Sequence, residues 1–210
     1  MSEVDVVCPV WRGREWVGAT LQSLREQTFK DWRLIVIDDA CPERTGDLVK
    51  RLQPSALRIE LESNVGAAVA RAVGIASSDS MFIALLDQDD LWHPRKLEAQ
   101  VAALREGPRV GAVHTDAILI DGEGGVLGPA DTNGRRKLNW ESGSQSELIR
   151  AQFAANRCLI NSAMIRREAW VDIGGQRDAY GGEDWGLWVR LLGYGWGLAH
   201  LEEPLLYYRR

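Results

Sequence analysis

Apolar and polar positions follow two periods along the first half of the chain. Four runs rich in apolar residues predict strands, at about 4–10, 33–38, 56–62 and 81–87. Helical spacing of apolar residues predicts helices from Trp16, over 42–52, around Val69–Ala76 and from Pro94, which suits the first turn of a helix. Strands that alternate with helices predict a parallel α/β sheet covered on both faces, with right-handed crossovers.

The pattern changes after residue 108. Residues 110–128 predict a strand, a Gly-rich turn and a short return strand, which together form an antiparallel element. Residues 128–147 are rich in Gly, Asp, Asn, Ser and Arg, and we expect them to form a mobile loop suited to act as a lid. Residues 148–173 predict a helix, the strand "CLINSAMI" and a second helix; "GGEDWGLWVRLL" opens another helix, and "GLAHLEEPLLYYRR" predicts a last strand.

Composition places the chain among ordinary globular proteins, with 210 residues, 45% of them hydrophobic and 26% charged. A formal net charge of -5 disfavours nucleic-acid binding, which needs a basic face. No apolar run approaches the roughly 18 residues of a membrane span, and "MSEVDVV" lacks the features of a signal peptide. The cysteines Cys8, Cys41 and Cys158 are odd in number and lack zinc-site spacing, so we expect reduced, inert thiols.

Acidic residues follow two of the four predicted strands of the first half. In an open α/β sheet, ligands bind beyond the carboxyl ends of the strands. The candidate ligand contacts at and after these ends are Pro9, Trp11, Asp38, Asp39, Asn64, Gly66, Arg71, Asp87, Gln88 and Asp89.

The segment "DQDD" (87–90) crowds three carboxylates into four positions, although like charges repel. A strand-end turn can point Asp87 and Asp89 into one cleft, where Mg²⁺ or Mn²⁺ takes one or two carboxylates together with phosphate oxygens and water. The spacing alone is a weak signal, because about one D-x-D triplet is expected by chance in such a chain. A solvated turn before the helix at Pro94 is the alternative.

Two further segments each allow two interpretations. Asp38 and Asp39 either cap the helix at 42–52 or accept hydrogen bonds from a base or a ribose. In "NVGAAVARAVGI", Asn64 and Gly66 suit unusual backbone angles at an anion-favouring helix start, and Arg71 is either a ligand contact or a solvated surface residue.

"GGEDWGLW" places Glu183 and Asp184 at another helix start, where acids act as caps. The functional interpretation makes Asp184 a general base that takes a proton from an attacking hydroxyl, with Gly181 and Gly182 letting the loop adapt to a substrate. P-loop, zinc-protease and hydrolase-elbow motifs are absent from the sequence.

Six segments, in order along nearly the whole chain, resemble the inverting glycosyltransferases of family 2, which have the GT-A fold. They are "VDVVCPVW", "SLREQTFKDWRLIVIDDA", "NVGAAVARAVGI", "LLDQDDLWHPRKLEAQ", "GGEDWGLWVRL" and "EPLLYYRR". The resemblance implies an α/β fold with a Rossmann-like, mostly parallel sheet, helices on both faces and a smaller antiparallel element on the acceptor side. It implies a single domain, with residues 1–108 binding the nucleotide sugar and residues 109–210 binding the acceptor.

The resemblance also implies roles for particular residues. Asp39 would bind the nucleotide base with help from Arg71, and Asp87 and Asp89 would hold the ribose and a Mn²⁺ or Mg²⁺ ion, with Asp90 as the alternative metal ligand. Asp184 would be the base of a single inverting displacement that releases a nucleoside diphosphate.

A glycan or lipid-linked acceptor is implied as well, in polysaccharide or other glycan biosynthesis. That would place a cytoplasmic enzyme at the inner face of the membrane, with at most peripheral membrane association. Acceptor contacts are expected among Trp11, Trp92, the segment 156–162 and Trp185.

The chain departs from the family pattern in three places: Arg12 replaces a usual Asn, "DACPERT" replaces "DGSTDGT", and the chain ends at Arg210 before a His that relatives use on the diphosphate. These departures leave a nucleotide-sugar-binding protein with weak or no transfer as the main alternative. A phosphatase-like hydrolase usually has Thr or Val where Leu91 stands, and a nucleotidyltransferase has a Gly-rich basic loop that "PVWRGREW" lacks.

Overall fold

The computed structural model describes residues 2–130, 144–154, 156, 158–175 and 183–210. The strands are β1 (Val4–Val10), β2 (Trp32–Asp38), β3 (Leu57–Glu60), β4 (Phe82–Leu85), β5 (Leu91–Trp92), β6 (Val110–Ile120), β7 (Val126–Pro129), β8 (Met164–Arg166) and β9 (Gly197–Arg209). The helices are α1 (Val17–Arg25), α2 (Thr45–Leu52), α3 (Ala67–Ala76), α4 (Lys96–Glu106), α5 (Gln145–Ala154), α6 (Arg167–Asp172) and α7 (Glu183–Gly193), with a 3-10 turn η1 (Ile160–Ser162).

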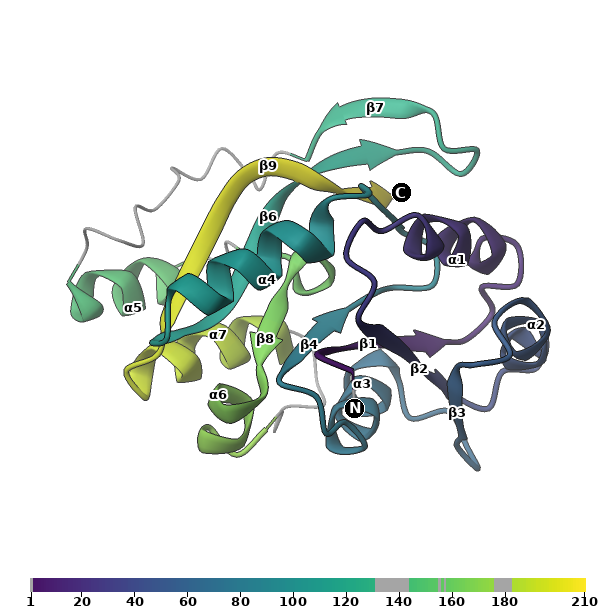
Figure 1. Ribbon diagram of the computed structural model, residues 1–210, viewed down its shortest axis with the longest axis horizontal. Helices are drawn as coiled ribbons and strands as arrows, with labels where there is room; N and C mark the ends of the chain where they lie inside the picture. Colours follow the sequence, from purple (N-terminus) through teal and green to yellow (C-terminus); the bar gives the residue numbers. More distant parts are fainter. Residues whose placement is uncertain (1, 131–143, 155, 157, 176–182) are drawn as a thin grey trace.

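The strands of the described residues form one sheet in the order β3-β2-β1-β4-β8-β6-β9-β5, with β7 paired to β6. The first four strands of this order run parallel, as the alternation of strands and helices predicts. Every residue of β1 is buried, because helices cover the sheet on both sides (Figure 1). The carboxyl ends of β1, β2 and β4 therefore meet at one edge of the sheet.

The second half of the chain adds the predicted antiparallel element. The short strand β8 pairs antiparallel with β4 and with β6, and β7 pairs antiparallel with β6. A long parallel pair between β6 and β9, which the sequence pattern did not indicate, completes this half. Because β8 reverses the direction twice, β6 and β9 run the same way as β1 and end at the same edge, where β9 arches over the molecule (Figure 1).

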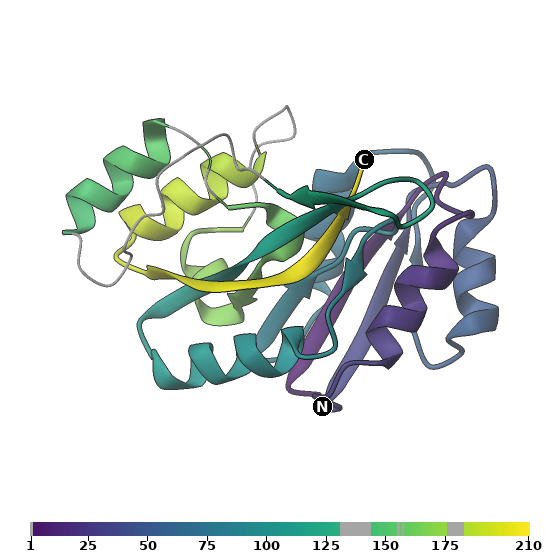
Figure 2. The ribbon, with the colours of Figure 1, turned by 90° about the horizontal axis from the view of Figure 1, so that it is seen from above.

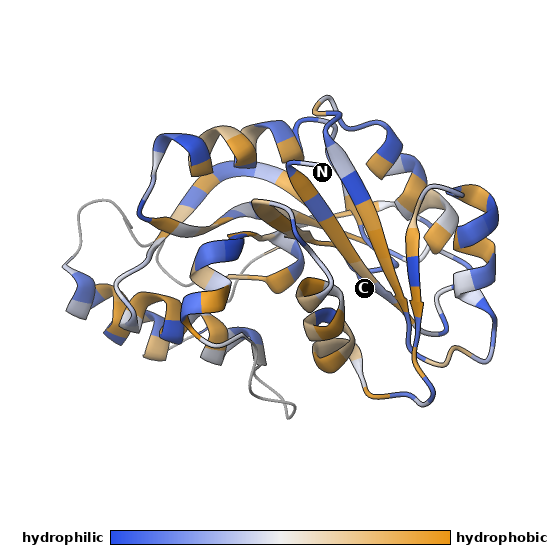
Figure 3. Cartoon of the chain, turned by 60° about the horizontal axis from the view of Figure 1, so that its bottom comes forward, coloured by the Kyte–Doolittle hydropathy of each residue, from blue (hydrophilic) through white to orange (hydrophobic). Residues whose placement is uncertain are grey.

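Two apolar layers lie on the two faces of the sheet. Helices α1, α2 and α4 cover one face, with Leu21 and Leu97 fully inside it. Helices α3, α5, α6 and α7 cover the other face, where Ile75, Leu187 and Trp188 are buried. Figure 3 shows the apolar strands between helices whose outer sides are polar, which is the arrangement that buries both faces of a parallel sheet.

Several element boundaries differ from the expectations, three of them with a clear effect on the element. The helix expected over 42–52 begins at Thr45, because Arg44 adopts a left-handed φ of 56° and ends the preceding turn. The helix expected from Pro94 begins at Lys96. In "CLINSAMI" only Met164 onward is a strand, since residues 160–162 form η1.

The expected lid loop lies mostly outside the described residues, at 131–143. No helix in the described ranges combines the length and the apolar character that a membrane crossing needs.

Candidate active site

A cavity of about 370 Å³ opens at the carboxyl ends of β1, β2 and β4. Its lining consists of Pro9, Val10, Trp11, Asp39, Asn64, Gly66, Ala67, Arg71, Asp87, Gln88 and Asp89. All the predicted ligand contacts after the strand ends lie here except Asp38. Segments up to 80 positions apart in the sequence therefore meet where the parallel sheet predicts a ligand site.

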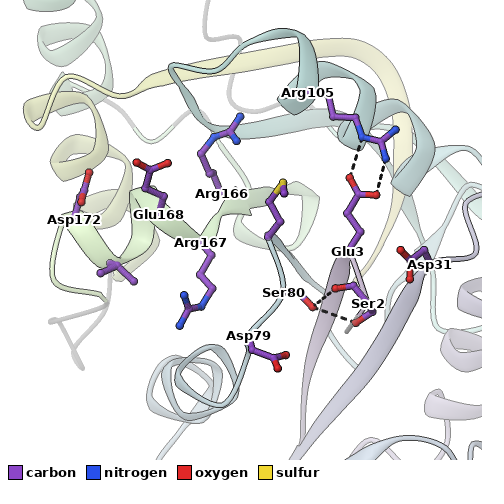
Figure 4. Close-up of a pocket in the computed structure, with 12 residues that line it drawn as sticks. Ser2, Glu3, Asp31, Asp79, Ser80, Arg105, Arg166, Arg167, Glu168 and Asp172 are labelled. Atoms are coloured by element: carbon purple, nitrogen blue, oxygen red, sulfur yellow. Dashed lines mark hydrogen bonds and ion pairs between the residues drawn. The ribbon is translucent and has the colours of Figure 1, made fainter.

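A larger cavity of about 1120 Å³ lies at the opposite edge of the sheet, next to the start of β1 (Figure 4). Its arginines are engaged within the fold: Arg105 pairs with Glu3, and Arg166 donates to the carbonyls of Leu104, Gly107 and Val110. These bonds stabilise the region around α4. We therefore assign these arginines a role in the fold rather than in ligand binding.

Asp39 joins the end of β2 to the start of α3. Its Oδ1 accepts from the backbone N–H of Val65 at 2.8 Å, and its Oδ2 accepts from Asn64 Nδ2 at 2.8 Å and from the Gly66 N–H at 2.9 Å. Gly66 has a φ of 85°, which glycine adopts without strain. A carboxylate has about four acceptor positions, so three donors leave room for one N–H of a base.

Asp38 points away from this cavity. Its Oδ1 accepts from the Cys41 N–H at 2.9 Å and its Oδ2 accepts from Arg58 at 2.8 Å. Both carboxylate oxygens stabilise the turn before α2 and the neighbouring strand β3, and Asp38 does not line the cavity, so its contact with a nucleotide stays a prediction.

Arg71 forms an ion pair with Asp87 on the cavity wall. The side chain is only 6% exposed, because α3 packs against β1 and β2 and carries it inward. The alternative interpretation of Arg71 as a solvated surface residue is therefore wrong. A buried guanidinium beside the D-x-D turn offsets part of the repulsion among its carboxylates.

Gln88 fastens the D-x-D turn to the loop after β1. Its Oε1 accepts from the Trp11 N–H at 2.9 Å and its Nε2 donates to the Trp11 carbonyl at 2.7 Å. Gly13 makes this approach possible, because a Cβ there would lie 2.1 Å from the Gln88 side chain. Arg12 stacks over the Trp11 ring at 4.6 Å and has a left-handed φ of 53°, a conformation that Asn adopts more readily than Arg.

Asp89 and Asp90 have different surroundings. Asp89 lines the cavity, where burial and then the charge of Asp87 raise its pKa. Asp90 is fully buried: it accepts from the Arg209 N–H at 3.0 Å and from Asn161 Nδ2, and burial together with Asp87 raises its pKa to about 8. Both oxygens of Asp90 bond inside the fold and Asp90 does not line the cavity, so its role as the alternative metal ligand stays a prediction.

The residues on the cavity wall fit a divalent cation whose coordination is completed by oxygens of the substrate and of water. Among the described side chains, no group of three His, Cys, Asp or Glu is arranged to hold a metal by itself. Mg²⁺ and Mn²⁺ need only one or two carboxylates when phosphate oxygens and water fill the other positions. Burial, and then the charge of Asp87, raise the pKa of Asp89, and a bound cation would favour its ionised form.

Arg209 also contacts the D-x-D turn, which the sequence did not indicate. Its Nε donates to the Asp89 carbonyl at 2.7 Å, and its Nη1 donates to the carbonyls of Asp121 at 2.7 Å and Gly122 at 2.8 Å. The end of β9 thus holds both the D-x-D turn and the turn between β6 and β7.

Asp184 is the second residue of α7. Its Oδ1 accepts from the Trp185 N–H at 2.8 Å and its Oδ2 accepts from Asn156 Nδ2 at 2.7 Å. It does not line the cavity described above. The predicted loop glycines Gly181 and Gly182 lie outside the described residues.

The acceptor candidates divide by exposure. Trp11 and Trp185 are 40% and 38% exposed, so both can contact a ligand. Trp92 is buried in the core with the Lys96 ammonium 4.1 Å from its ring centroid, which removes it from the acceptor candidates.

Comparison with known proteins gives a family and several relatives. The model of the family described as "Glycosyl transferase family 2" matches residues 5–174. The chain is 35% identical over 104 residues to the Escherichia coli UDP-Glc:alpha-D-GlcNAc-diphosphoundecaprenol beta-1,3-glucosyltransferase WfgD, covering 48% of this chain and 40% of that protein. It is 23% identical over 211 residues to the uncharacterized glycosyltransferase MJ1057 of Methanocaldococcus jannaschii, covering 98% of this chain and 70% of that protein. In three further bacterial relatives the match spans 18% to 42% of their length, less than half.

Solved structures show the same fold. S. aureus TarS 1–349 in complex with UDP-GlcNAc has a TM-score of 0.79 at 16% identity, covering 99% of this chain and 58% of that one. The mannosyltransferase PcManGT from Pyrobaculum calidifontis in complex with GDP-Man and Mn²⁺ has a TM-score of 0.72 at 18% identity, covering 96% and 55%. The predicted α/β fold of the GT-A type is confirmed.

Proposed function

This chain belongs to glycosyltransferase family 2, and we propose that it transfers a sugar from a nucleoside-diphosphate sugar to an acceptor hydroxyl with inversion, using Mn²⁺ or Mg²⁺. The observation that carries the proposal is the meeting of Asp39, Arg71, Asp87 and Asp89 around one cavity at the carboxyl edge of the sheet. Each of these groups suits a different part of a nucleotide sugar.

Donor binding follows from the chemistry of the cavity wall. The open acceptor position of Asp39 suits an N–H of the base, and Asp87 suits ribose hydroxyls. The start of α3 after Gly66 favours the diphosphate through the helix dipole. The UDP-GlcNAc and GDP-Man bound by the structural neighbours support a donor of this class.

Asp89, with Asp87, would hold the divalent cation. When bound, the ion supplies Lewis-acid stabilisation of the negative charge on the departing diphosphate. The Mn²⁺ in the PcManGT complex supports the use of a divalent cation.

The proposed base is Asp184. Its carboxylate takes the proton of the acceptor hydroxyl while the hydroxyl oxygen bonds to the anomeric carbon, and the bond from that carbon to the diphosphate oxygen breaks on the opposite side. The configuration at the anomeric carbon inverts and the nucleoside diphosphate leaves. Both oxygens of Asp184 already accept one hydrogen bond each, so the carboxylate is held before a substrate arrives.

The acceptor class comes from the relatives. WfgD acts on a sugar linked to diphosphoundecaprenol, which supports a lipid-linked or other glycan acceptor and a role in polysaccharide biosynthesis. A lipid-linked acceptor would place the reaction at the cytoplasmic face of a membrane, with at most peripheral association of this chain.

Calorimetry with UDP and GDP, with and without Mn²⁺, tests the proposal. We expect Mn²⁺-dependent binding of one nucleotide by the wild type, its loss in Asp89→Ala, and unchanged binding in Asp31→Ala, which removes a carboxylate at the opposite edge of the sheet. Asp184→Asn should keep nucleotide binding and lose transfer. Metal-independent binding would contradict the role of Asp89, and nucleotide binding without turnover of any donor would favour the binding-protein alternative.

A further inference from the structure

Two asparagines of one short segment hold carboxylates on the two sides of the candidate site. Asn156 Nδ2 donates to Asp184 Oδ2 at 2.7 Å, and Asn161 Nδ2 donates to the buried Asp90 of the D-x-D turn. We propose that Asn156 is a positioning residue for Asp184, and that this segment sets the place of the base relative to the D-x-D turn. The inference rests on the proposed function, because it assumes that Asp184 is the base.

The amide of Asn156 is oriented by its own neighbours. Its Oδ1 accepts from Gln152 Nε2 at 3.1 Å and from the Cys158 N–H at 3.2 Å. A flipped amide would set its NH₂ group against these two donors and its oxygen against the carboxylate of Asp184, so the orientation that donates to Asp184 is the favoured one. Gln152 lies on α5 and is fully buried, so its side chain holds the Asn156 amide in this orientation.

The two hydrogen bonds to Asp184 leave its carboxylate little freedom to rotate. One donor is the side chain of Asn156 and the other is the backbone of Trp185, so each oxygen has one partner and keeps an acceptor position for a hydroxyl. A displacement of about 1 Å in a reacting group can lower a rate by roughly a hundredfold. Loss of the Asn156 amide should therefore appear in turnover rather than in donor binding.

The other end of the segment is anchored in the core. The Ser162 carbonyl accepts from Gln100 of α4 at 2.8 Å, and the Cys158 carbonyl accepts from the Trp188 indole of α7 at 3.1 Å. Asn161 is 3% exposed, and its partner Asp90 also accepts from the Arg209 N–H. Ser162, Cys158 and Asn161 are thus bonded to α4, to α7 and to the D-x-D turn, respectively.

The test is a double-mutant cycle between Asn156 and Asp184. Wild type, Asn156→Ala, Asp184→Asn and the double variant are assayed for release of nucleoside diphosphate from UDP-GlcNAc and GDP-mannose, with UDP affinity measured in Mn²⁺. We expect Asn156→Ala to lower kcat about 10- to 100-fold, with donor KM and UDP Kd within about twofold of wild type. In the Asp184→Asn background, the same substitution should change kcat no further.

Two further variants separate positioning from folding. Asn156→Asp keeps the shape and removes the NH₂ donor, so it should lose at least as much kcat as the Ala variant. Gln53→Ala removes an exposed amide at the end of α2 and should leave every parameter unchanged.

Wild-type kcat in both Asn156 variants would overturn the inference, as would a full additive loss in the Asp184→Asn background or a loss confined to KM. Wild-type kcat in Asp184→Asn would overturn the base assignment of the proposed function instead. Absence of turnover by the wild type with either donor would overturn transfer from these donors, and the positioning role with it.

Discussion

His114 and His200 form a stacked pair outside the candidate site. Their ring centroids lie 4.5 Å apart, and His200 Nε2 lies 2.8 Å from Asp116 Oδ1. Burial, and then the neighbouring His200, lower the pKa of His114 to about 3, while Asp116 acts in the opposite direction. His114 is therefore neutral in the folded protein near neutral pH.

This neutral histidine predicts a loss of stability in acid. Between pH 6.5 and about 3 the unfolded chain binds a proton on this residue that the folded chain does not, so falling pH favours unfolding. From pH 7 to pH 5 the free energy of unfolding should fall by about 2 kcal/mol on this account. His114→Phe, which cannot be protonated, should lose less over the same interval.

Urea unfolding of both proteins at pH 7 and pH 5 measures the effect. Equal pH dependence in the wild type and in His114→Phe would show that His114 does not carry it.

Single residues also show where sequence reasoning reaches its limit. Asp39, Asp87 and Asp89 could be predicted, because a carboxylate after a parallel strand has a known place in the fold. Asp38 and Asp90 could not be separated from their neighbours, since which of two adjacent side chains faces the cavity depends on the end of the strand. Asn156 falls in the segment expected to contact the acceptor, but its bond to Asp184, like the bond of Arg209 to the D-x-D turn, is a tertiary contact that no local pattern indicates.

Among the elements, α3 packs unusually close to the sheet while it carries Arg71 to the cavity. A Cβ at Gly74 would lie 2.4 Å from Ile37 Cδ1 and 2.6 Å from Val7 Cγ1. The small residue therefore sets the distance between α3 and the strands β1 and β2, and with it the depth of Arg71.

Gly74→Ala and Gly18→Ala should have opposite effects on stability. Alanine is favoured over glycine inside a helix by about 1 kcal/mol, and at Gly18 of α1 the nearest atom to an added Cβ is 4.0 Å away, so stability should rise. At Gly74 the overpacking should dominate and lower the free energy of unfolding by about 1–3 kcal/mol. Denaturant unfolding of the two variants compares them, and a stabilised Gly74→Ala would refute the close contact.

The spacing of apolar residues predicted most elements of the first half of the chain, because a buried parallel strand and an amphipathic helix have distinct sequence patterns. The same spacing wrongly predicted a strand over the whole of "CLINSAMI". There the Ser162 N–H and hydroxyl both bond to the Leu159 carbonyl, and the Asn161 side chain bonds to Asp90, so η1 forms instead. Strand β5 has two residues, too few to leave a pattern.

At the scale of the whole molecule, the two halves of the chain meet at the D-x-D turn. Arg209 donates to three backbone carbonyls, on that turn and on the turn between β6 and β7. These contacts join the last strand to the first half of the chain, and they help to fix the backbone that presents Asp89.

Arg209→Ala should therefore weaken Mn²⁺-dependent UDP binding by about tenfold or more, and Arg209→Lys should restore only part of it, because lysine lacks the planar fork of donors. Arg210→Ala removes the same charge one residue later, from an exposed position, and serves as the matched control. Calorimetry compares the three, and equal affinities in Arg209→Ala and Arg210→Ala would refute a role for the fork.

The opposite placement of the two ends of the chain has a practical consequence (Figure 2). Strand β9 ends against the D-x-D turn, whereas the residues before β1 lie at the far edge of the sheet. A polyhistidine purification tag fused after Arg210 would bring imidazoles beside the carboxylates that are to bind manganese, and imidazole competes for such ions. A tag fused ahead of Ser2 would keep those imidazoles at the remote edge and leave metal titrations interpretable.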